Sequence, residues 1–154
     1  MKLTVIAVGR LKERFWREAA DEYLKRLTPY AAVSVVEIED RDSGRDAARA
    51  LAEEGSDILR ALPRDAHVIA LEIDGRQRSS EQFAARLDEL ALDGRSTLAL
   101  VVGGSVGLSA DVLARADERL SLGPMTLPHN LARVVLLEQV YRAFRINRGE
   151  PYHK

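Results

Sequence analysis

The chain has 154 residues, of which 46% are hydrophobic and 31% are charged. This length suits one compact domain with a buried core, spanning residues 1–154, and is too short for two ordinary domains. There is no cysteine, which excludes thiol nucleophiles, disulfides, zinc–thiolate sites and cysteine-bound iron–sulfur clusters, and we expect no metal site.

Charge is divided unevenly along the chain. The formal net charge is −1, but residues 1–30 and 121–154 carry +3 each and residues 31–120 carry −7. We therefore expect at most a local basic patch, built from both ends of the chain, rather than a generally basic surface. The first ten residues hold too short an apolar run for a signal peptide, and no later segment is apolar enough to cross a bilayer. We expect a cytoplasmic protein with no membrane contact.

Continuous apolar runs alternate with helical patterns in chain order. Runs without polar alternation are typical of strands buried on both faces, as in parallel sheets covered by helices. The expected strands cover residues 3–8, 31–38, 67–73, 97–102 and 119–122. The expected helices cover residues 13–27 and 45–62, follow Ser79 and Ser109, and run from His129 or Asn130 to about residue 148. The fold class is α/β, a mostly parallel sheet flanked by helices.

Local signals place several helix ends. Ser79 and Gln82 have the spacing of a capping box, and Asn130 is a good residue to cap the last helix. Gly149 is expected to end that helix. In the first helix, Phe15, Ala19, Tyr23 and Leu27 repeat every four residues and predict one apolar face. Residues 40–47 are expected to form an exposed, mobile loop.

The segment VVGGSVGLS, residues 101–109, follows a strand and precedes a helix. Glycines there allow backbone to approach a ligand, but a tight structural turn explains them equally well. The spacing does not match the G-x-G-x-x-G fingerprint of dinucleotide-binding folds, and no P-loop sequence occurs in the chain.

Two long tracts carry no charged side chain, residues 96–110 and residues 120–132. In a chain this rich in charge, such tracts are expected to lie together in the interior. If they flank a pocket, it suits a neutral flat group such as adenine, held by backbone hydrogen bonds and apolar contacts. The alternative is a buried connection packed by Met125 and Leu127.

The end of the chain combines an apolar helix with polar side chains. Val134 to Leu137 are four apolar residues in succession, which predicts a helix that is deeply buried or lies in an oligomer interface. Glu138 and Arg142 are four residues apart and can simply form a salt bridge. Tyr152 can stack on a base or pack on the sheet, and His153 can titrate near neutral pH.

Taken together, the segments VVGGSVGLS, LSLGPMTLPH, RVVLLEQVYRAF and PYHK, with MKLTVIAVG and LEIDG before them, resemble the ribosomal RNA large-subunit methyltransferase H family of the SPOUT class. The resemblance covers the whole chain. It implies N3-methylation of a pseudouridine in large-subunit ribosomal RNA, a carboxyl-terminal trefoil knot, and a homodimer that gives the last helix its partner. S-adenosyl-L-methionine is the implied cofactor, and the implied cofactor-binding residues are Leu71, Gly103, Gly104, Gly123, Pro124, Met125, Thr126, Leu127 and Pro128.

The resemblance also suggests catalytic residues and partners. Arg142 would favour the anion left when the N3 proton departs, and His153 or His129, with Tyr152 nearby, would relay that proton. A basic patch of Arg10, Lys12, Arg133 and Arg148 would hold the RNA, either as free ribosomal RNA or in the assembled ribosome.

Two other classes of protein remain open. One is an α/β nucleotide-binding enzyme that acts on a small metabolite. The other is a non-catalytic dimeric module that associates with ribosomes.

Overall fold

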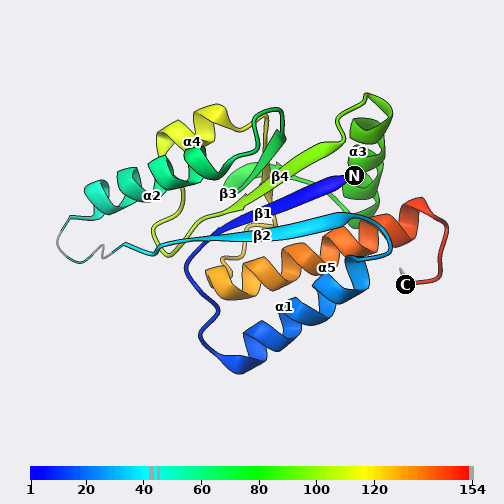
Figure 1. Cartoon of the computed structure of the whole chain (residues 1–154), viewed down its shortest axis with the longest axis horizontal. Helices are drawn as coiled ribbons and strands as arrows, with labels where there is room; N and C mark the ends of the chain where they lie inside the picture. The colour runs from blue at the N-terminus through cyan, green and yellow to red at the C-terminus, as the bar shows by residue number, and fades with distance from the viewer. Residues whose placement is uncertain (42–43, 45, 153–154) are drawn as a thin grey trace.

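The computed structural model describes residues 1–41, 44 and 46–152. Strands and helices alternate along the chain, as Figure 1 shows. The elements are β1 (Lys2–Val8), α1 (Arg14–Leu27), β2 (Ala32–Ile38), α2 (Ala47–Ala61), β3 (His67–Gln77), α3 (Ser80–Leu92), β4 (Thr97–Val102), α4 (Ala110–Arg115), β5 (Glu118–Ser121) and α5 (His129–Asn147). The strands form one sheet in the order β2-β1-β4-β3-β5, and each neighbouring pair is parallel. The α/β prediction is confirmed.

Helices cover both faces of this sheet. Helices α1, α3 and α5 lie on one face, with α5 packed against both of the others, and α2 and α4 lie on the opposite face (Figure 1). Each face has its own buried cluster of aliphatic side chains. Every residue of β4 from Leu98 to Val102 is buried, which is why the central strands appear in the sequence as unbroken apolar runs.

Strand β3 is longer than expected, because it contains an irregularity. Leu71 and Arg76 both pair with Leu120 of β5, so the four residues between them bulge out of the sheet. Gly75 makes the bulge possible, since a Cβ at that position would lie 2.8 Å from the backbone carbon of Arg119. The sequence prediction ended this strand at residue 73 and missed the bulge.

The helix-end signals are mostly confirmed. Ser79 and Gln82 form the capping box, with the Gln82 amide donating to Ser79 Oγ at 3.1 Å and the Ser79 amide donating to Gln82 Oε1 at 2.9 Å. Gly149 adopts φ +65° directly after α5, and the Glu150 amide donates to the carbonyl of Arg145 at 2.9 Å, as in a Schellman motif. The predicted Asn130 cap is wrong, because α5 already begins at His129 and Pro128 occupies the N-cap position.

The predicted apolar face of α1 is only partly right. Leu27 is fully buried, but Phe15 is 61% exposed and stacks at an angle on Trp16, with ring centroids 4.9 Å apart. Ala19 and Tyr23 pack against the core as predicted, and Trp16 and Ala20 face it as well. Phe15 lies in the first turn of the helix, beyond the edge of the surface that α1 covers.

Residues 42, 43 and 45 of the expected mobile loop lie outside the described residues. The loop begins in a fixed position, because Arg41 donates to Asp57 of α2 at 2.8 Å. The trefoil knot stays a prediction of the family resemblance. In the described part of the chain, no helix has the length and apolar character needed to cross a membrane.

Candidate functional site

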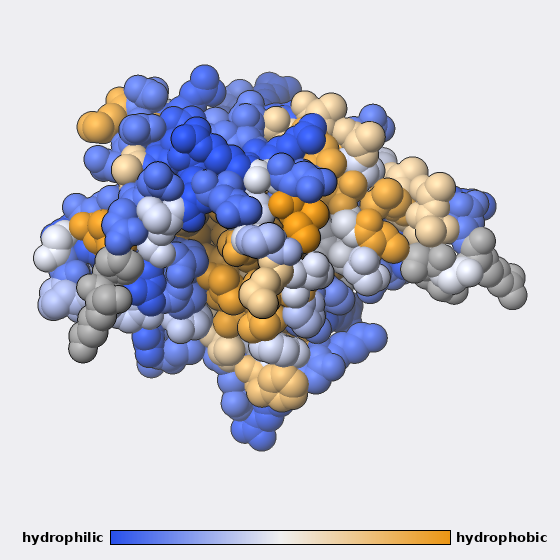
Figure 2. Space-filling view, turned by 180° about the vertical axis from the view of Figure 1, so that it is seen from behind, coloured by the Kyte–Doolittle hydropathy of each residue, from blue (hydrophilic) through white to orange (hydrophobic). Residues whose placement is uncertain are grey.

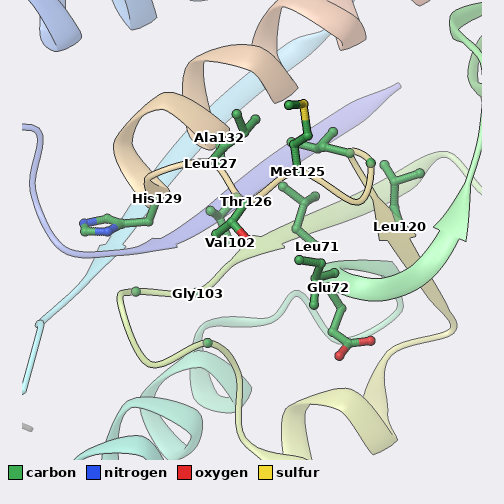
Figure 3. Close-up of a pocket in the computed structure, with 15 residues that line it drawn as sticks. Leu71, Glu72, Val102, Gly103, Leu120, Met125, Thr126, Leu127, His129 and Ala132 are labelled. Carbon is green, nitrogen blue, oxygen red and sulfur yellow. The ribbon is translucent and has the colours of Figure 1, made fainter.

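A cavity of about 160 Å³ lies at the carboxyl ends of β3, β4 and β5, where ligands bind in open parallel sheets. Both uncharged tracts line it, which confirms that they are neighbours (Figure 3). We call it the donor cavity. Its lining residues are Leu71, Glu72, Ile73, Val102, Gly103, Gly104, Gly107, Leu120, Leu122, Gly123, Met125, Thr126, Leu127, His129 and Ala132.

Glycines form one wall of the donor cavity for a steric reason. A Cβ on Gly103 would lie 2.6 Å from the carbonyl oxygen of Gly107, and a Cβ on Gly104 would lie 3.0 Å from Val8. Gly104 and Gly107 form an isolated bridge that closes this loop on itself. The loop therefore keeps its tight shape only without a side chain at Gly103, whereas a side chain at Gly104 would require the Val8 side chain to move by a few tenths of an ångström.

The opposite wall is the loop between β5 and α5, and most of its backbone polar groups are unused. Within residues 122–127, all of which the structure describes, the backbone makes hydrogen bonds only through Gly123, which exchanges two with Ser121 Oγ at 3.1 and 3.2 Å. Unpaired amides and carbonyls beside an apolar cavity can recognise the polar edge of a flat heterocycle.

Seven of the nine predicted cofactor-binding residues line the donor cavity, namely Leu71, Gly103, Gly104, Gly123, Met125, Thr126 and Leu127. Pro124 and Pro128 are not among the lining residues, and they border the loop that carries the others. Met125 is 84% exposed and lies at the rim. The alternative of a fully buried connection is therefore wrong.

Sequence reasoning missed Glu72 and Ile73, which the β3 bulge carries into the lining. Glu72 is the one acidic side chain among the lining residues. The signal in the sequence was Asp74-Gly75, a turn-forming pair placed directly after an apolar strand.

His129 lies at the edge of the donor cavity, and its imidazole points away from Leu71 and Met125 (Figure 3). It also lines a second cavity with Gly9 and Asp40. The imidazole is therefore placed between the two cavities, where it can reach a substrate approaching from either side.

Arg142 and Tyr152 form a cluster around Glu138, away from the donor cavity. Arg142 donates to Glu138 Oε1 through Nε at 3.0 Å and Nη2 at 2.6 Å, and Tyr152 donates to the same oxygen at 3.1 Å. The guanidinium also lies 4.8 Å from the centroid of the Tyr152 ring. Tyr152 thus packs on α5, and the simple Glu138–Arg142 salt bridge is confirmed.

These contacts fix the protonation states of the cluster. The hydrogen bond with Glu138 holds the pKa of Arg142 above its usual range. Burial, together with the carboxylate of Glu138, raises the pKa of Tyr152 to about 12. Thirteen residues separate Arg142 from His129, which is roughly 20 Å along a helix, so one chain does not bring this cluster to its own donor cavity. His153 lies outside the described residues.

The predicted basic patch is assembled only in part. Arg10, Lys12 and Arg133 line one cavity. Arg133 is 4% exposed and donates to Glu37 at 2.8 Å and to the carbonyl of Gly9 at 2.7 Å. Arg148 lies 4.5 Å from the centroid of the Tyr30 ring, at the far end of α5. Arg10 and Lys12 are therefore exposed neighbours, Arg133 is buried and paired beside them, and Arg148 lies apart.

The apolar run of the last helix is explained within one chain. Val134, Leu136 and Leu137 are at most 8% exposed, because α5 packs between α1 and α3. Val135 is half-buried, on a side of the helix that neither neighbour covers completely. Among the described residues, no group of His, Asp or Glu side chains is arranged to hold a metal ion.

Comparison with known proteins gives consistent results. A family model described as "Predicted SPOUT methyltransferase" matches residues 1–153. A protein of Listeria welshimeri named ribosomal RNA large subunit methyltransferase H is 54% identical over the whole of both chains, and a Bacillus thuringiensis protein of the same name is 52% identical over the same extent.

Two solved structures share the fold. A probable methyltransferase from Bordetella pertussis Tohama I has a TM-score of 0.61 at 14% identity, covering 93% of this chain and 96% of that one. A probable methylase family protein from Haemophilus influenzae Rd KW20 has a TM-score of 0.58 at 13% identity, covering 99% of this chain and 70% of that one.

Proposed function

The chain belongs to the SPOUT methyltransferase family, and from this premise we propose that it methylates N3 of a pseudouridine in large-subunit ribosomal RNA, with S-adenosyl-L-methionine as methyl donor. The relatives that match over their full length carry the name of a large-subunit ribosomal RNA methyltransferase. The observation that carries the proposal is the donor cavity, built where the two uncharged tracts meet. Such an enzyme works where ribosomes are made, in the cytoplasm.

The residues of the donor cavity fit an adenosyl group. Leu71, Leu120 and Leu127 supply apolar contacts, and the unused backbone groups of residues 122–127 supply hydrogen bonds in place of charged side chains. Gly103 and Gly104 have no side chains, so the opposite wall leaves room for the ligand. When bound, the sulfonium of the cofactor supplies an electrophilic methyl group. The main task of the protein is then to position the base nitrogen in line with it, which contributes about 7–11 kcal/mol in well-oriented reactions.

The proton on N3 must also leave, and Arg142 can favour this step. A permanent cation beside the base stabilises the anion that remains after deprotonation. Tyr152, whose pKa is raised to about 12, stays neutral, and its single O–H donates to Glu138, so it holds the Glu138–Arg142 pair in place. His129 at the edge of the cavity can accept the proton.

This assignment requires a second copy of the chain. Because Arg142 lies roughly 20 Å along α5 from the donor cavity of its own chain, we propose a homodimer in which two α5 helices lie antiparallel. A two-fold axis then places the Glu138, Arg142 and Tyr152 cluster of each copy beside the donor cavity of the other. The half-buried outer side of α5, which includes Val135 and Gln139, forms the contact.

Transfer of a labelled methyl group to ribosomes and to naked ribosomal RNA tests the proposed function. We expect incorporation at a single pseudouridine. A metabolite enzyme would bind the cofactor without labelling RNA, and a non-catalytic ribosome module would show no thermal stabilisation by the cofactor. Either result would contradict the proposal.

Mixing two inactive variants tests the shared site. Gly103→Ala weakens cofactor binding and is expected to be inactive at limiting cofactor concentration, and Arg142→Gln removes the cation, each in its own copy. Random re-association puts both lesions into one site of a mixed dimer and leaves the other site intact, so about a quarter of wild-type activity should return. If each variant is inactive and the mixture stays inactive although mixed dimers form, the two residues act within one chain and the antiparallel arrangement is wrong.

A further inference from the structure

Four arginines surround a cavity of about 490 Å³ on the far side of the β3 bulge from the donor cavity. The lining residues are Arg76, Arg78, Arg86, Glu89, Glu118 and Arg119, so the lining carries two more positive charges than negative ones. We call this cavity the arginine pocket. Nothing in the proposed chemistry of methyl transfer uses it.

Glu118 holds two of these arginines in place. It accepts from Arg86 Nε at 2.7 Å, from Arg78 at 3.2 Å and from His67 at 2.8 Å. Burial alone would raise the pKa of Glu118, but the hydrogen bonds from Arg86 and His67 outweigh it, so its pKa is lowered. The side chains of Arg78 and Arg86 are only 14% and 25% exposed. The floor of the pocket is therefore rigid, and its two arginines are balanced by Glu118 and by Glu89, which accepts from Arg86 at 3.1 Å, so the excess positive charge of the lining comes from Arg76 and Arg119.

The other two arginines are available to a ligand. Arg76 and Arg119 are exposed, and within the described residues neither forms an ion pair. The one hydrogen bond of the Arg119 side chain goes to the carbonyl of Leu113 at 3.4 Å. Two guanidinium groups with unused donors, above a rigid floor of paired charges, match the geometry of a phosphate, which arginine binds in bidentate fashion.

The arginine pocket is next to the donor cavity. Leu71 of the donor cavity and Arg76 of the arginine pocket pair with the same residue, Leu120, which itself lines the donor cavity. A third hollow, lined by Arg78, Leu120 and Leu122 among others, connects the two. Figure 2 shows an apolar patch in the middle of the face opposite to that of Figure 1, bordered by hydrophilic side chains.

We propose that the arginine pocket binds a backbone phosphate of the ribosomal RNA strand, close to the nucleotide whose base is methylated beside the donor cavity. This inference rests on the proposed function and adds the contact that positions its substrate. The location favours RNA over an acidic protein segment, because a strand with its base against the cofactor at the donor cavity must place neighbouring phosphates within reach of this site. Phosphate contacts set the register of a nucleic acid without reading its sequence.

The test is the double variant Arg76→Gln/Arg119→Gln, compared with Arg14→Gln/Arg49→Gln. The control removes the same charge from two exposed arginines of α1 and α2, whose ion pairs are exposed i,i+4 contacts. We expect the double variant to raise KM for the RNA substrate about 10- to 100-fold, because charge-assisted contacts to one phosphate are lost. The slope of log K against log salt should fall by about 1–2.

Cofactor affinity and kcat at saturating RNA should stay at the wild-type level. Arg76→Lys/Arg119→Lys should restore part of the RNA affinity, because lysine returns the positive charge but lacks the planar guanidinium that binds a phosphate through two N–H groups. A double variant that matches the control in KM and salt slope overturns the proposal. Loss of affinity for assembled ribosomes with unchanged affinity for naked RNA also overturns it, because the partner would then be a ribosomal protein.

A further measurement distinguishes binding of RNA from binding of a free anion. If inorganic phosphate stabilises the wild type but not the double variant, while KM for RNA is equal in both, the pocket binds a free anion and the proposal is wrong. Absence of methyl transfer to RNA by the wild type would instead reject the proposed function. The two failures are therefore distinguishable.

Discussion

Replacement of Gly103 by alanine should weaken cofactor binding while leaving the fold intact. The added Cβ would lie 2.6 Å from the carbonyl oxygen of Gly107 and 2.8 Å from its carbonyl carbon. Both atoms belong to the backbone of the same loop, so no flexible side chain can move aside. The loop itself must shift, and it is one wall of the donor cavity.

The size of the effect follows from this clash. Inserting a methyl group where packing is complete costs typically about 1–3 kcal/mol. If the loop must spend this free energy to return to the shape that binds the cofactor, cofactor affinity falls roughly 5- to 150-fold. The φ of Gly103 is not positive, so the effect is steric and not a consequence of backbone strain at that residue.

Isothermal titration with the cofactor and urea unfolding measure the two quantities separately. The matched control is Gly94→Ala, at the end of α3, where a Cβ meets nothing within 4 Å but φ is +76°. It should lose about 1–2 kcal/mol of stability and keep cofactor affinity. Wild-type cofactor affinity in Gly103→Ala would refute the reasoning, since the glycine wall would then not shape the binding site.

Three further predictions concern buried charges. Glu118→Gln should lower the free energy of unfolding by roughly 1–3 kcal/mol at pH 7. Because the pKa of Glu118 is lowered in the fold, the stability that its carboxylate contributes should decrease as the pH drops below about 4.3. A variant that is destabilised as much at pH 3 as at pH 7 would contradict this. Glu54→Gln should raise the free energy of unfolding at pH 7, since burial raises the pKa of Glu54 and one of its oxygens has no partner among the described residues. Urea titrations at pH 7 and pH 4 should show this increase only at pH 7. Arg133→Met should destabilise the chain and leave the salt dependence of RNA affinity unchanged, because this side chain is buried against Glu37. A reduced slope of log K against log salt would show instead that Arg133 contacts RNA.

Local patterns in the sequence predicted the elements well because their causes are local. An unbroken apolar run such as residues 97–102 is required wherever a strand has helices on both faces. The Ser79 capping box and Gly149 act on backbone groups only a few residues away. The donor cavity was also predictable, since absence of charge in two separate tracts has few explanations in a chain that is 31% charged.

The features that sequence reasoning missed depend on distant partners. Nothing near Arg133 indicates that Glu37 and the Gly9 carbonyl will surround it, so it was taken for a surface cation. Likewise, the arginines of the arginine pocket come from β3, the loop after it, α3 and β5, and only the sheet order places them together. The β3 bulge depends on a strand that follows it by more than forty residues.

The difference in charge between the donor cavity and the arginine pocket has a physical reason. The positive sulfonium of the proposed cofactor is favoured by Glu72, the one acidic residue of its lining, and would be opposed by a guanidinium in direct contact with it, whereas Arg142 of the partner subunit is proposed to face the base. The RNA substrate needs cations, because its backbone is negative. The β3 bulge meets both needs over a short distance, since Leu71 and Arg76 pair with the same residue of β5 but face different cavities. Shortening the bulge would therefore be expected to weaken cofactor and RNA binding together, which no substitution in either cavity alone should do.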